Sequence, residues 1–300
     1  MVRHLVCGID HTGGGDRAAA TGAQLARDLR CGVSLVHVLR GAQLGKSGDA
    51  IAIGAADEHR WLQELSTEYG LAPDTPVAVF GGDPADALID AAQAEDADFI
   101  VVGSRGLHEL GDAVLGSVSC ELMRTAPCPV VVAPPDLPVP LVPLSLRPVV
   151  CGVEGSNRDH STLRLAADLA ERLGAALHAV HAFDPRPVAP SPAGAMAPTL
   201  PVLSQAAEAT LEHALSNAGV EAKRHVVSSP PADALMRVVE EIGAGLLVVG
   251  SPGRGKIGAA ILGSVAIRLA AEARVAVVAL PPAASLERGS GHYEGTDVAA

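Results

Sequence analysis

Two glycine-rich segments contain the residues of this chain that are best suited to chemistry. One runs from Gly103 to Ser117 and the other from Gly250 to Ser264, and both read Gly-x-x-Gly, nine residues, Gly-Ser after a pair of valines. Glycine admits positive φ and close approach of the backbone to a ligand. Gly-Ser at the start of a helix presents free N–H groups and a hydroxyl at the positive end of the helix dipole. Because an ordinary turn rarely recurs at the same spacing, the pattern predicts a phosphate-type anion site in each half.

The two segments belong to an internal duplication. Val-Cys-Gly-Ile-Asp at 6–10 returns as Val-Cys-Gly-Val-Glu at 150–154, and Pro-Ala-Asp-Ala-Leu at 84–88 returns unchanged at 231–235. The offset is 144 residues for the first match and 147 for the second, and the glycine segments share the latter. We therefore expect two copies of one domain, a proline-rich linker between them and a disordered tail. The domains and the tail are expected at 1–137, 145–284 and 285–300.

Each half alternates short apolar runs with Ala/Leu-rich segments of helical spacing, which is typical of βαβ units. This predicts an α/β protein of two tandem Rossmann-like domains, each a five-stranded parallel, doubly wound sheet with helices on both faces. The last strand of each half is an apolar edge strand, so we expect the two to pair across a pseudo-twofold axis. In the first half the strands are expected at 4–9, 33–39, 75–80, 99–102 and 130–133 and the helices at 17–30, 55–69, 85–95 and 116–124. The strands of the second half are expected at 149–153, 177–182, 220–227, 246–249 and 275–280.

Further candidate residues stand at the ends of the predicted strands. In an open α/β sheet, ligands bind beyond the carboxyl ends of the strands. In the first half Asp10 follows the first strand, Val38 lies at the end of the second, and Val102 precedes the glycine motif. Glu154 and Val249 occupy the positions of Asp10 and Val102 in the second half. We expect these side chains to lie around the same site as the glycine motif.

These motifs resemble those of the universal stress protein family in its tandem, two-domain form, over the whole chain except the tail. The resemblance implies binding of ATP, with Mg²⁺ bound through the phosphates. It implies that Asp10 lies at the ribose and adenine end and that Val38 lines the adenine pocket. Glu154 and Ala182 stand where the family has Asp and Val, so the resemblance supports the phosphate loop of the second pocket rather than its adenosine end. The residues that would surround ribose and phosphates are Gly103, Gly106, Gly116, Ser117 and Val118, and in the second half Gly250, Gly253, Gly263, Ser264 and Val265.

Composition limits the other partners. A net charge of −12 and only six aromatic residues (three Phe, two Tyr and one Trp) argue against a nucleic-acid partner. The five cysteines include no C-x-x-C pair and the eleven histidines no H-E-x-x-H, so no metal site is expected. His37 and His181, which recur at the end of the second strand of each half, are expected as satisfied core or dimer-adjacent histidines. Prolines interrupt the uncharged stretch 187–207 and no secretory segment is apparent, so we expect a cytoplasmic protein without membrane contact.

No catalytic residue is evident, because there is no G-x-S-x-G elbow and no base near Ser104 in the sequence. Asp86 and Asp233 are expected to stabilise a helix dipole. The leading hypothesis is therefore a regulatory stress-response protein rather than an enzyme. Its ATP occupancy would modulate an unidentified protein partner, and any hydrolysis would be slow. The two-domain chain is a candidate to form a homodimer. Two alternative functions remain, an ATP-dependent transferase or ligase on the same fold and a scaffold whose glycine loops no longer bind.

Overall fold

The computed structural model describes eight stretches of the chain, which contain all the strands and helices named below. In helix α2 the side chains are described only from Gly54 onwards. The described stretches are 2–39, 48–104, 115–137, 142–145, 147–156, 158–184, 199–250 and 263–284.

The first repeat, residues 4–133, alternates strands and helices as the sequence predicts. Its strands are β1 (His4–Ile9), β2 (Gly32–Leu39), β3 (Val77–Gly81), β4 (Phe99–Gly103) and β5 (Val130–Ala133). Its helices are α1 (Gly13–Leu29), α2 (Gly48–Glu68), α3 (Pro84–Ala94) and α4 (Ser117–Thr125). The third strand begins two residues later than predicted, because Thr75 still belongs to a turn and donates its N–H to the carbonyl of Ala72 at 2.9 Å.

The second repeat, residues 149–280, follows the same order. Its strands are β6 (Val149–Val153), β7 (Leu177–Phe183), β8 (Lys223–Ser228), β9 (Leu246–Gly250) and β10 (Ala276–Leu280). Its helices are α5 (Asp159–Arg172), α6 (Leu200–Ala218), α7 (Pro231–Ile242) and α8 (Ser264–Glu272). Strand β8 starts later than the predicted residue 220, because Val220 donates its N–H to the carbonyl of Leu215 at 3.1 Å and so closes the end of α6.

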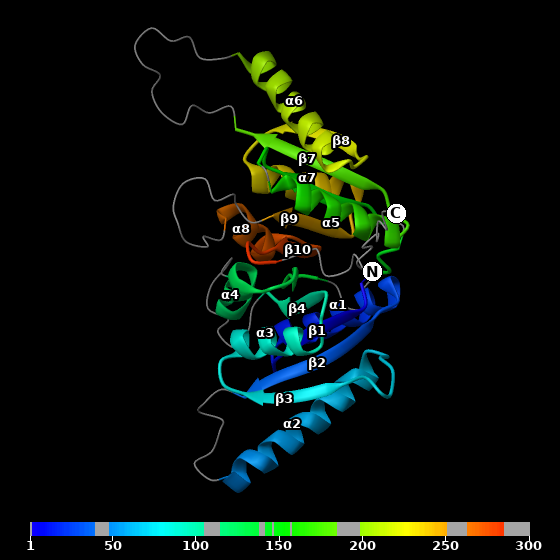
Figure 1. Cartoon of the computed structure of the whole chain (residues 1–300), viewed down its shortest axis with the longest axis vertical. Coiled ribbons are helices and arrows are strands. Elements are labelled where there is room, and N and C mark those ends of the chain that lie inside the picture. The colour runs from blue at the N-terminus through cyan, green and yellow to red at the C-terminus, as the bar shows by residue number, and fades with distance from the viewer. Residues whose placement is uncertain are drawn as a thin grey trace, which may run out of the picture.

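All ten strands form one continuous sheet in the order β3-β2-β1-β4-β5-β10-β9-β6-β7-β8 (Figure 1). The strands are parallel within each repeat, whereas β5 and β10 pair antiparallel, with Val131 opposite Val278 and Val132 opposite Val277. The predicted pairing of the two last strands is therefore confirmed. It satisfies the backbone groups of two buried apolar strands that would otherwise be sheet edges.

Helices cover both faces of the sheet, as in a doubly wound fold. On one face the core contains Leu25 of α1 and Leu62 of α2, together with leucines of α5 and α6. On the other face Leu88 of α3 and Leu122 of α4 pack with leucines of α7 and α8. Successive residues of a strand point to opposite faces. Two neighbouring residues at the end of one strand therefore lie on different faces of the sheet. No helix in the described stretches is both long enough and apolar enough to cross a membrane.

Helix α1 begins at Gly13, four residues earlier than the sequence predicts. The hydroxyl of Thr12 accepts the N–H of Gly14 at 3.1 Å, and Oδ1 of Asp10 accepts the N–H of Gly15 at 3.2 Å. Such capping acceptors satisfy N–H groups that have no partner within the helix. The three glycines 13–15 therefore form the first turn of a helix rather than a loop.

Candidate functional site

A cavity of about 270 Å³ opens at the carboxyl ends of β6, β7 and β9 in the second repeat. The start of α5 and the start of α8 close its sides, and Pro231 and Leu235 of α7 line it from one face of the sheet. Its volume is close to the lower limit of small-molecule sites, which is about 300 Å³. The cavity therefore lies where an open α/β sheet places its ligands.

The residues predicted for the second site come together at this cavity. Glu154 lines it from the end of β6 and Ala182 from β7. Gly253 lies outside the described residues. The role of each lining residue in binding stays a prediction. The other predicted residues that line the cavity are Val249, Gly250, Gly263, Ser264 and Val265.

In the first repeat the corresponding residues occupy matching places. Val38 at the end of β2 and Val118 in the first turn of α4 are partly buried and pack against the same apolar cluster as the buried Val102. Gly116 precedes α4 and donates its N–H to the carbonyl of Ser104 at 2.7 Å, while Ser117 is exposed. Gly106 lies outside the described residues. The valines and the helix start thus lie at one end of the sheet, as predicted.

The four motif glycines in the described part of the chain do not have the positive φ that the sequence predicts. Gly116 and Gly263 have φ of −61° and −65°, and neither Gly103 nor Gly250 has a positive φ. Gly103 and Gly250 instead stand where there is no space for a side chain. A Cβ on Gly103 would lie 2.4 Å from the backbone oxygen of Gly14, and a Cβ on Gly250 would lie 2.6 Å from the hydroxyl of an α5 threonine. The expected positive φ is therefore wrong at these four positions. Close packing of the end of β4 against the start of α1, and of the end of β9 against α5, explains Gly103 and Gly250.

Helices α4 and α8 both begin without a side-chain cap. Their N-cap residues are Gly116 and Gly263, and neither helix has a hydrogen bond from a capping side chain. Ser117 and Ser264 are the first helical residues, so their hydroxyls lie one position past the cap. The uncapped N–H groups and the positive end of the dipole make each helix start suitable for an anion.

The turn after β6 is organised by Asp159, which the sequence analysis missed. Its carboxylate accepts the N–H groups of Glu154, Gly155 and Ser156 at 3.1, 2.7 and 2.7 Å. In the first repeat Asp10 does this work from the end of the strand, accepting the hydroxyl and N–H of the next turn through Oδ1. The signal was present in the sequence, since Ser156 followed three residues later by Asp is the pattern that begins a helix.

Because Asp159 rather than residue 154 holds this turn in the second repeat, a different set of side chains faces the cavity. The backbone N–H of Glu154 donates to Asp159, but the Glu154 side chain takes no part in the three turn-forming bonds and is exposed at the cavity, whereas the Asp159 carboxylate is engaged. Arg158, which takes the place of Gly14, also lines the cavity and donates from Nη2 to the carbonyl of Pro282 at 3.1 Å. The second site therefore has a carboxylate available for hydroxyl groups and a nearby guanidinium, which suits a phosphate.

The two recurrent histidines share one contact. Nδ1 of His37 lies 2.8 Å from the carbonyl oxygen of Ile9, and Nδ1 of His181 lies 2.8 Å from that of Val153. The expectation of satisfied histidines holds for these Nδ1 atoms. It is wrong for Nε2 of His37, which is buried and has no hydrogen-bond partner among the described residues.

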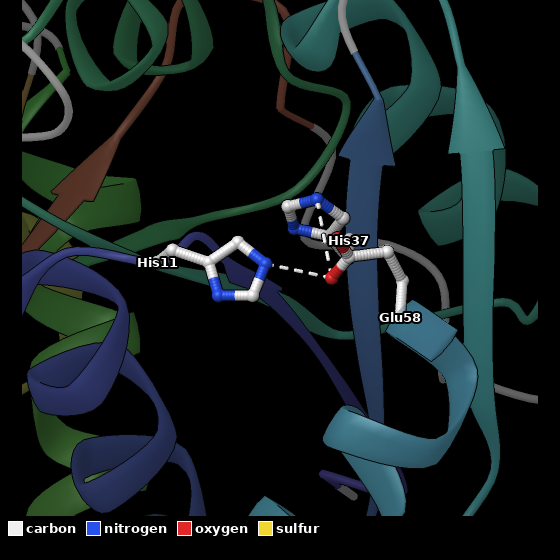
Figure 2. Close-up of side chains that lie close together, drawn as sticks. All are labelled: His11, His37 and Glu58. Atoms are coloured by element: carbon white, nitrogen blue, oxygen red, sulfur yellow. Dashed lines mark hydrogen bonds and ion pairs between the residues drawn. The ribbon is translucent and has the colours of Figure 1, made fainter. Parts of the chain in front are cut away.

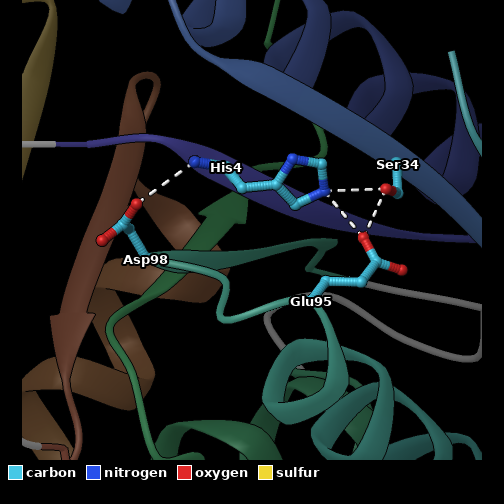
Figure 3. A network of polar contacts seen from close by, with 4 residues as sticks. All are labelled: His4, Ser34, Glu95 and Asp98. Atoms are coloured by element: carbon cyan, nitrogen blue, oxygen red, sulfur yellow. Dashed lines mark hydrogen bonds and ion pairs between the residues drawn. The ribbon is translucent and has the colours of Figure 1, made fainter. Parts of the chain in front are cut away.

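A polar network at the amino ends of the strands is fully engaged in holding the fold (Figure 3). Nε2 of His4 lies 2.7 Å from the hydroxyl of Ser34 and 2.7 Å from Oε2 of Glu95, at the end of α3. The backbone N–H of His4 donates to Asp98 at 3.1 Å. These contacts join β1, β2 and the turn before β4 at the amino ends of these strands. Asp233, expected to act on a helix dipole, also forms an ion pair with Arg268 at 2.7 Å.

Comparison with known proteins agrees with this architecture. The family model described as the universal stress protein family matches residues 1–134 and 145–281. Universal stress protein Rv2005c of Mycobacterium tuberculosis is 30% identical over 301 residues, which cover 91% of this chain and 95% of that protein. A universal stress protein of Mycolicibacterium smegmatis is 34% identical over 201 residues, 65% of each chain.

A solved structure shows the same fold. The crystal structure of a universal stress protein from Archaeoglobus fulgidus matches with a TM-score of 0.67 at 21% identity, covering 94% of this chain and 99% of that one. The two matches to the family model cover both repeats. The chain therefore belongs to the universal stress protein family, with two of the family's domains in tandem.

Proposed function

We propose that the second repeat binds an adenine nucleotide, ATP, in its cavity, and that nucleotide occupancy changes how the chain interacts with a protein partner. The observation that carries the proposal is the cavity itself, which brings Gly250, the first glycine of the Gly-x-x-Gly motif, together with the uncapped start of α8. Backbone N–H groups at such a helix start bind phosphate oxygens. The resemblance noted in the sequence supplies the choice of ATP among phosphate-bearing ligands.

Each end of the nucleotide has residues suited to it. The N–H groups of Ser264 and Val265 and the guanidinium of Arg158 would take the phosphates, with Mg²⁺ held by the phosphates rather than by a side chain. Glu154 would accept hydrogen bonds from ribose hydroxyls, and Ala182 would contact the apolar base. We propose binding rather than turnover. A general base would need a free acceptor, and the Asp159 carboxylate already accepts three backbone N–H groups.

The loop charges predict how the two repeats differ. Between Gly250 and Gly263 the sequence carries Arg254 and Lys256, a net charge of +2, whereas Arg105, Glu109 and Asp112 give −1 in the first repeat. Unit charges about 4 Å apart interact by roughly 1 kcal/mol in water and more near a protein surface. We therefore expect the second repeat to prefer ATP over AMP more strongly and to lose that preference as salt rises.

Isothermal titration calorimetry of the full chain tests the proposal, with ATP, AMP and GTP at low and high salt. Gly253→Val places a branched side chain in the second loop and is expected to remove binding there, and Gly106→Val does the same in the first. Glu154→Ala is expected to weaken ATP and AMP alike. Undiminished ATP stoichiometry in the double Gly→Val variant would refute the assignment of these loops.

The proposed regulation has its own readout. A second copy of the chain is the simplest partner, so the molar mass in solution is measured by light scattering with and without ATP, and pull-downs compare the two states for other proteins. A nucleotide-dependent change in either measurement supports regulation. Identical results with and without bound ATP would leave nucleotide binding intact but contradict its regulatory role.

A further inference from the structure

We propose that the first repeat carries a binding site for a divalent transition-metal ion, formed by His11, His37 and Glu58. These side chains come from the end of β1, the end of β2 and helix α2, and they converge on one point (Figure 2). Nε2 of His11 lies 2.7 Å from Oε2 of Glu58, and Nε2 of His37 lies 3.9 Å from the same oxygen. The three ligand atoms all lie within 4.8 Å of one another.

His37 supplies the observation that points to an ion. It is 4% exposed, and its Nδ1 must carry the hydrogen, because the carbonyl oxygen 2.8 Å away can only accept. In the neutral imidazole the lone pair therefore belongs to Nε2, the buried atom that has no hydrogen-bond partner in the described part of the chain. Buried polar atoms nearly always have a partner. Metal-binding histidines typically donate their other N–H to a carbonyl or carboxylate, as His37 does.

The spacing of the three side chains suits coordination. Ligand atoms around a tetrahedral ion, at bond lengths of about 2.0–2.1 Å, lie roughly 3.3 Å apart. The two separations from Glu58, 2.7 and 3.9 Å, lie on either side of that value. The His11 ring lies against Trp61 in a tilted contact with centroids 3.9 Å apart. The His11 side chain is 44% exposed, so an ion can reach it from solvent. Two imidazoles, one carboxylate and an open fourth position suit Zn²⁺.

The site is separate from the proposed nucleotide site. Glu58 and Trp61 belong to α2, on the face of the sheet that α1 and α2 cover. Val38, the neighbour of His37 on β2, packs on the opposite face, against the apolar cluster that includes α3 and α4. Because neighbouring strand residues point to opposite faces, an ion on His37 and a base against Val38 would occupy different sides of the same strand.

Comparison with the second repeat shows which features of the proposed metal site are common to both repeats. His181 makes the same backbone bond as His37, at 2.8 Å. Gly155, however, stands at the position of His11. When α2 and α6 are aligned on their fully buried leucines at 62 and 211, Ala207 stands at the position of Glu58. The bond from Nδ1 is therefore common to both repeats, whereas the two additional ligands are confined to the first.

Zinc titration of the full chain, tag-free and stripped with a chelator, tests the proposal. Affinity is measured by competition with a chromophoric chelator, and Co²⁺ reports geometry through its visible absorption. We expect one Zn²⁺ per chain and a tetrahedral Co²⁺ spectrum. Loss of one ligand should weaken zinc affinity more than about 100-fold, because replacing a residue that only hydrogen-bonds to a ligand already weakens metal affinity by about 10–100-fold. The test variants are Glu58→Gln, His11→Gly and His37→Gln, and the controls are His181→Gln and His59→Gln, the latter an exposed histidine next to Glu58.

The outcomes are distinguishable. Loss of binding in the three test variants, with both controls unchanged, supports the site. Equal affinity in Glu58→Gln and in the unmodified protein, an octahedral Co²⁺ spectrum, or no binding would overturn it. Glu58→Gln is isosteric and 20% exposed, so it keeps the test valid if His37→Gln fails to fold, which far-UV circular dichroism reveals. No nucleotide is present in these titrations, so their result does not depend on the proposed function.

Discussion

Replacing Asp159 tests how a single carboxylate shapes the turn beside the cavity. The residue is 6% exposed and its two oxygens accept three backbone N–H groups, two of them at 2.7 Å. In Asp159→Ala all three N–H groups lose their acceptor. In Asp159→Asn the shape is kept, but one oxygen becomes an NH₂ group that faces another donor. The two variants therefore separate the loss of the whole acceptor from the loss of its charge.

The size of the effect follows from the surroundings. Hydrogen bonds to a charged acceptor contribute about 1.5–3 kcal/mol each, so three give an upper limit of about 4.5–9 kcal/mol. Glu154 and Gly155 are exposed, so water replaces part of what is lost. Capping residues accordingly contribute only about 0.5–2 kcal/mol when replaced. We expect the free energy of unfolding to fall by about 2–4 kcal/mol in Asp159→Ala and about 1–2 kcal/mol in Asp159→Asn.

Urea unfolding followed by far-UV circular dichroism measures this loss without any ligand. Asp168→Asn is the matched control, because that carboxylate is 46% exposed and pairs with Arg172 on the same helix at 2.7 Å. Exposed pairs of this kind contribute less than about 1 kcal/mol. If Asp159→Ala loses no more stability than the control, the turn is not held by this carboxylate and the reasoning fails.

Three further predictions test other parts of the molecule. We expect Gly103→Ala to lower the free energy of unfolding more than Gly250→Ala, because the new Cβ meets backbone at 2.4 Å in the first and a side-chain hydroxyl at 2.6 Å in the second; equal losses in urea unfolding would contradict this. Burial, with a neighbouring histidine and lysine, lowers the pKa of His178 below its usual 6.5. The unfolded chain therefore binds the proton first as pH falls. We therefore expect protonation of His178 to destabilise the fold below about pH 6.5 and to have no effect above it. The difference in free energy of unfolding between His178→Asn and the unmodified protein should then change with pH, and a difference independent of pH would refute this. Burial raises the pKa of the Cys7 and Cys151 thiols, so we expect neither to react with iodoacetamide until the chain unfolds, as read by mass spectrometry; rapid labelling of the native protein would argue against it.

The fold could be predicted because the periodicity of apolar residues indicates each strand and helix, and the internal repeat indicates two copies of one domain. The alternation of apolar runs and helical segments predicts the strands, and the apolar character of 130–132 and 275–278 predicts the pairing of β5 with β10. The helix starts were harder. Helix α1 begins at Gly13 because Thr12 and Asp10 accept hydrogen bonds from glycine N–H groups of its first turn, and helix propensity alone does not reveal such caps at a run of glycines.

The site was predictable only in outline. The duplication led us to assign equal roles to residues at equal positions, so Glu154 was compared with Asp10 while the turn-forming carboxylate had moved to Asp159. The convergence of His11 and Glu58 could not be predicted either. It joins residues 47 positions apart and depends on how α2 is rotated over the sheet, which no local pattern determines.

The antiparallel pairing of β5 with β10 has a consequence for how the chain behaves on dilution. Because both strands belong to one molecule, their association depends on an effective concentration, which is in the millimolar range for short flexible linkers. It does not depend on the amount of protein present. Identical subunits of a symmetric dimer must carry every substitution twice, whereas the two halves of this chain can change separately. Differences such as His11 against Gly155 can therefore accumulate in one half while the shared sheet remains intact.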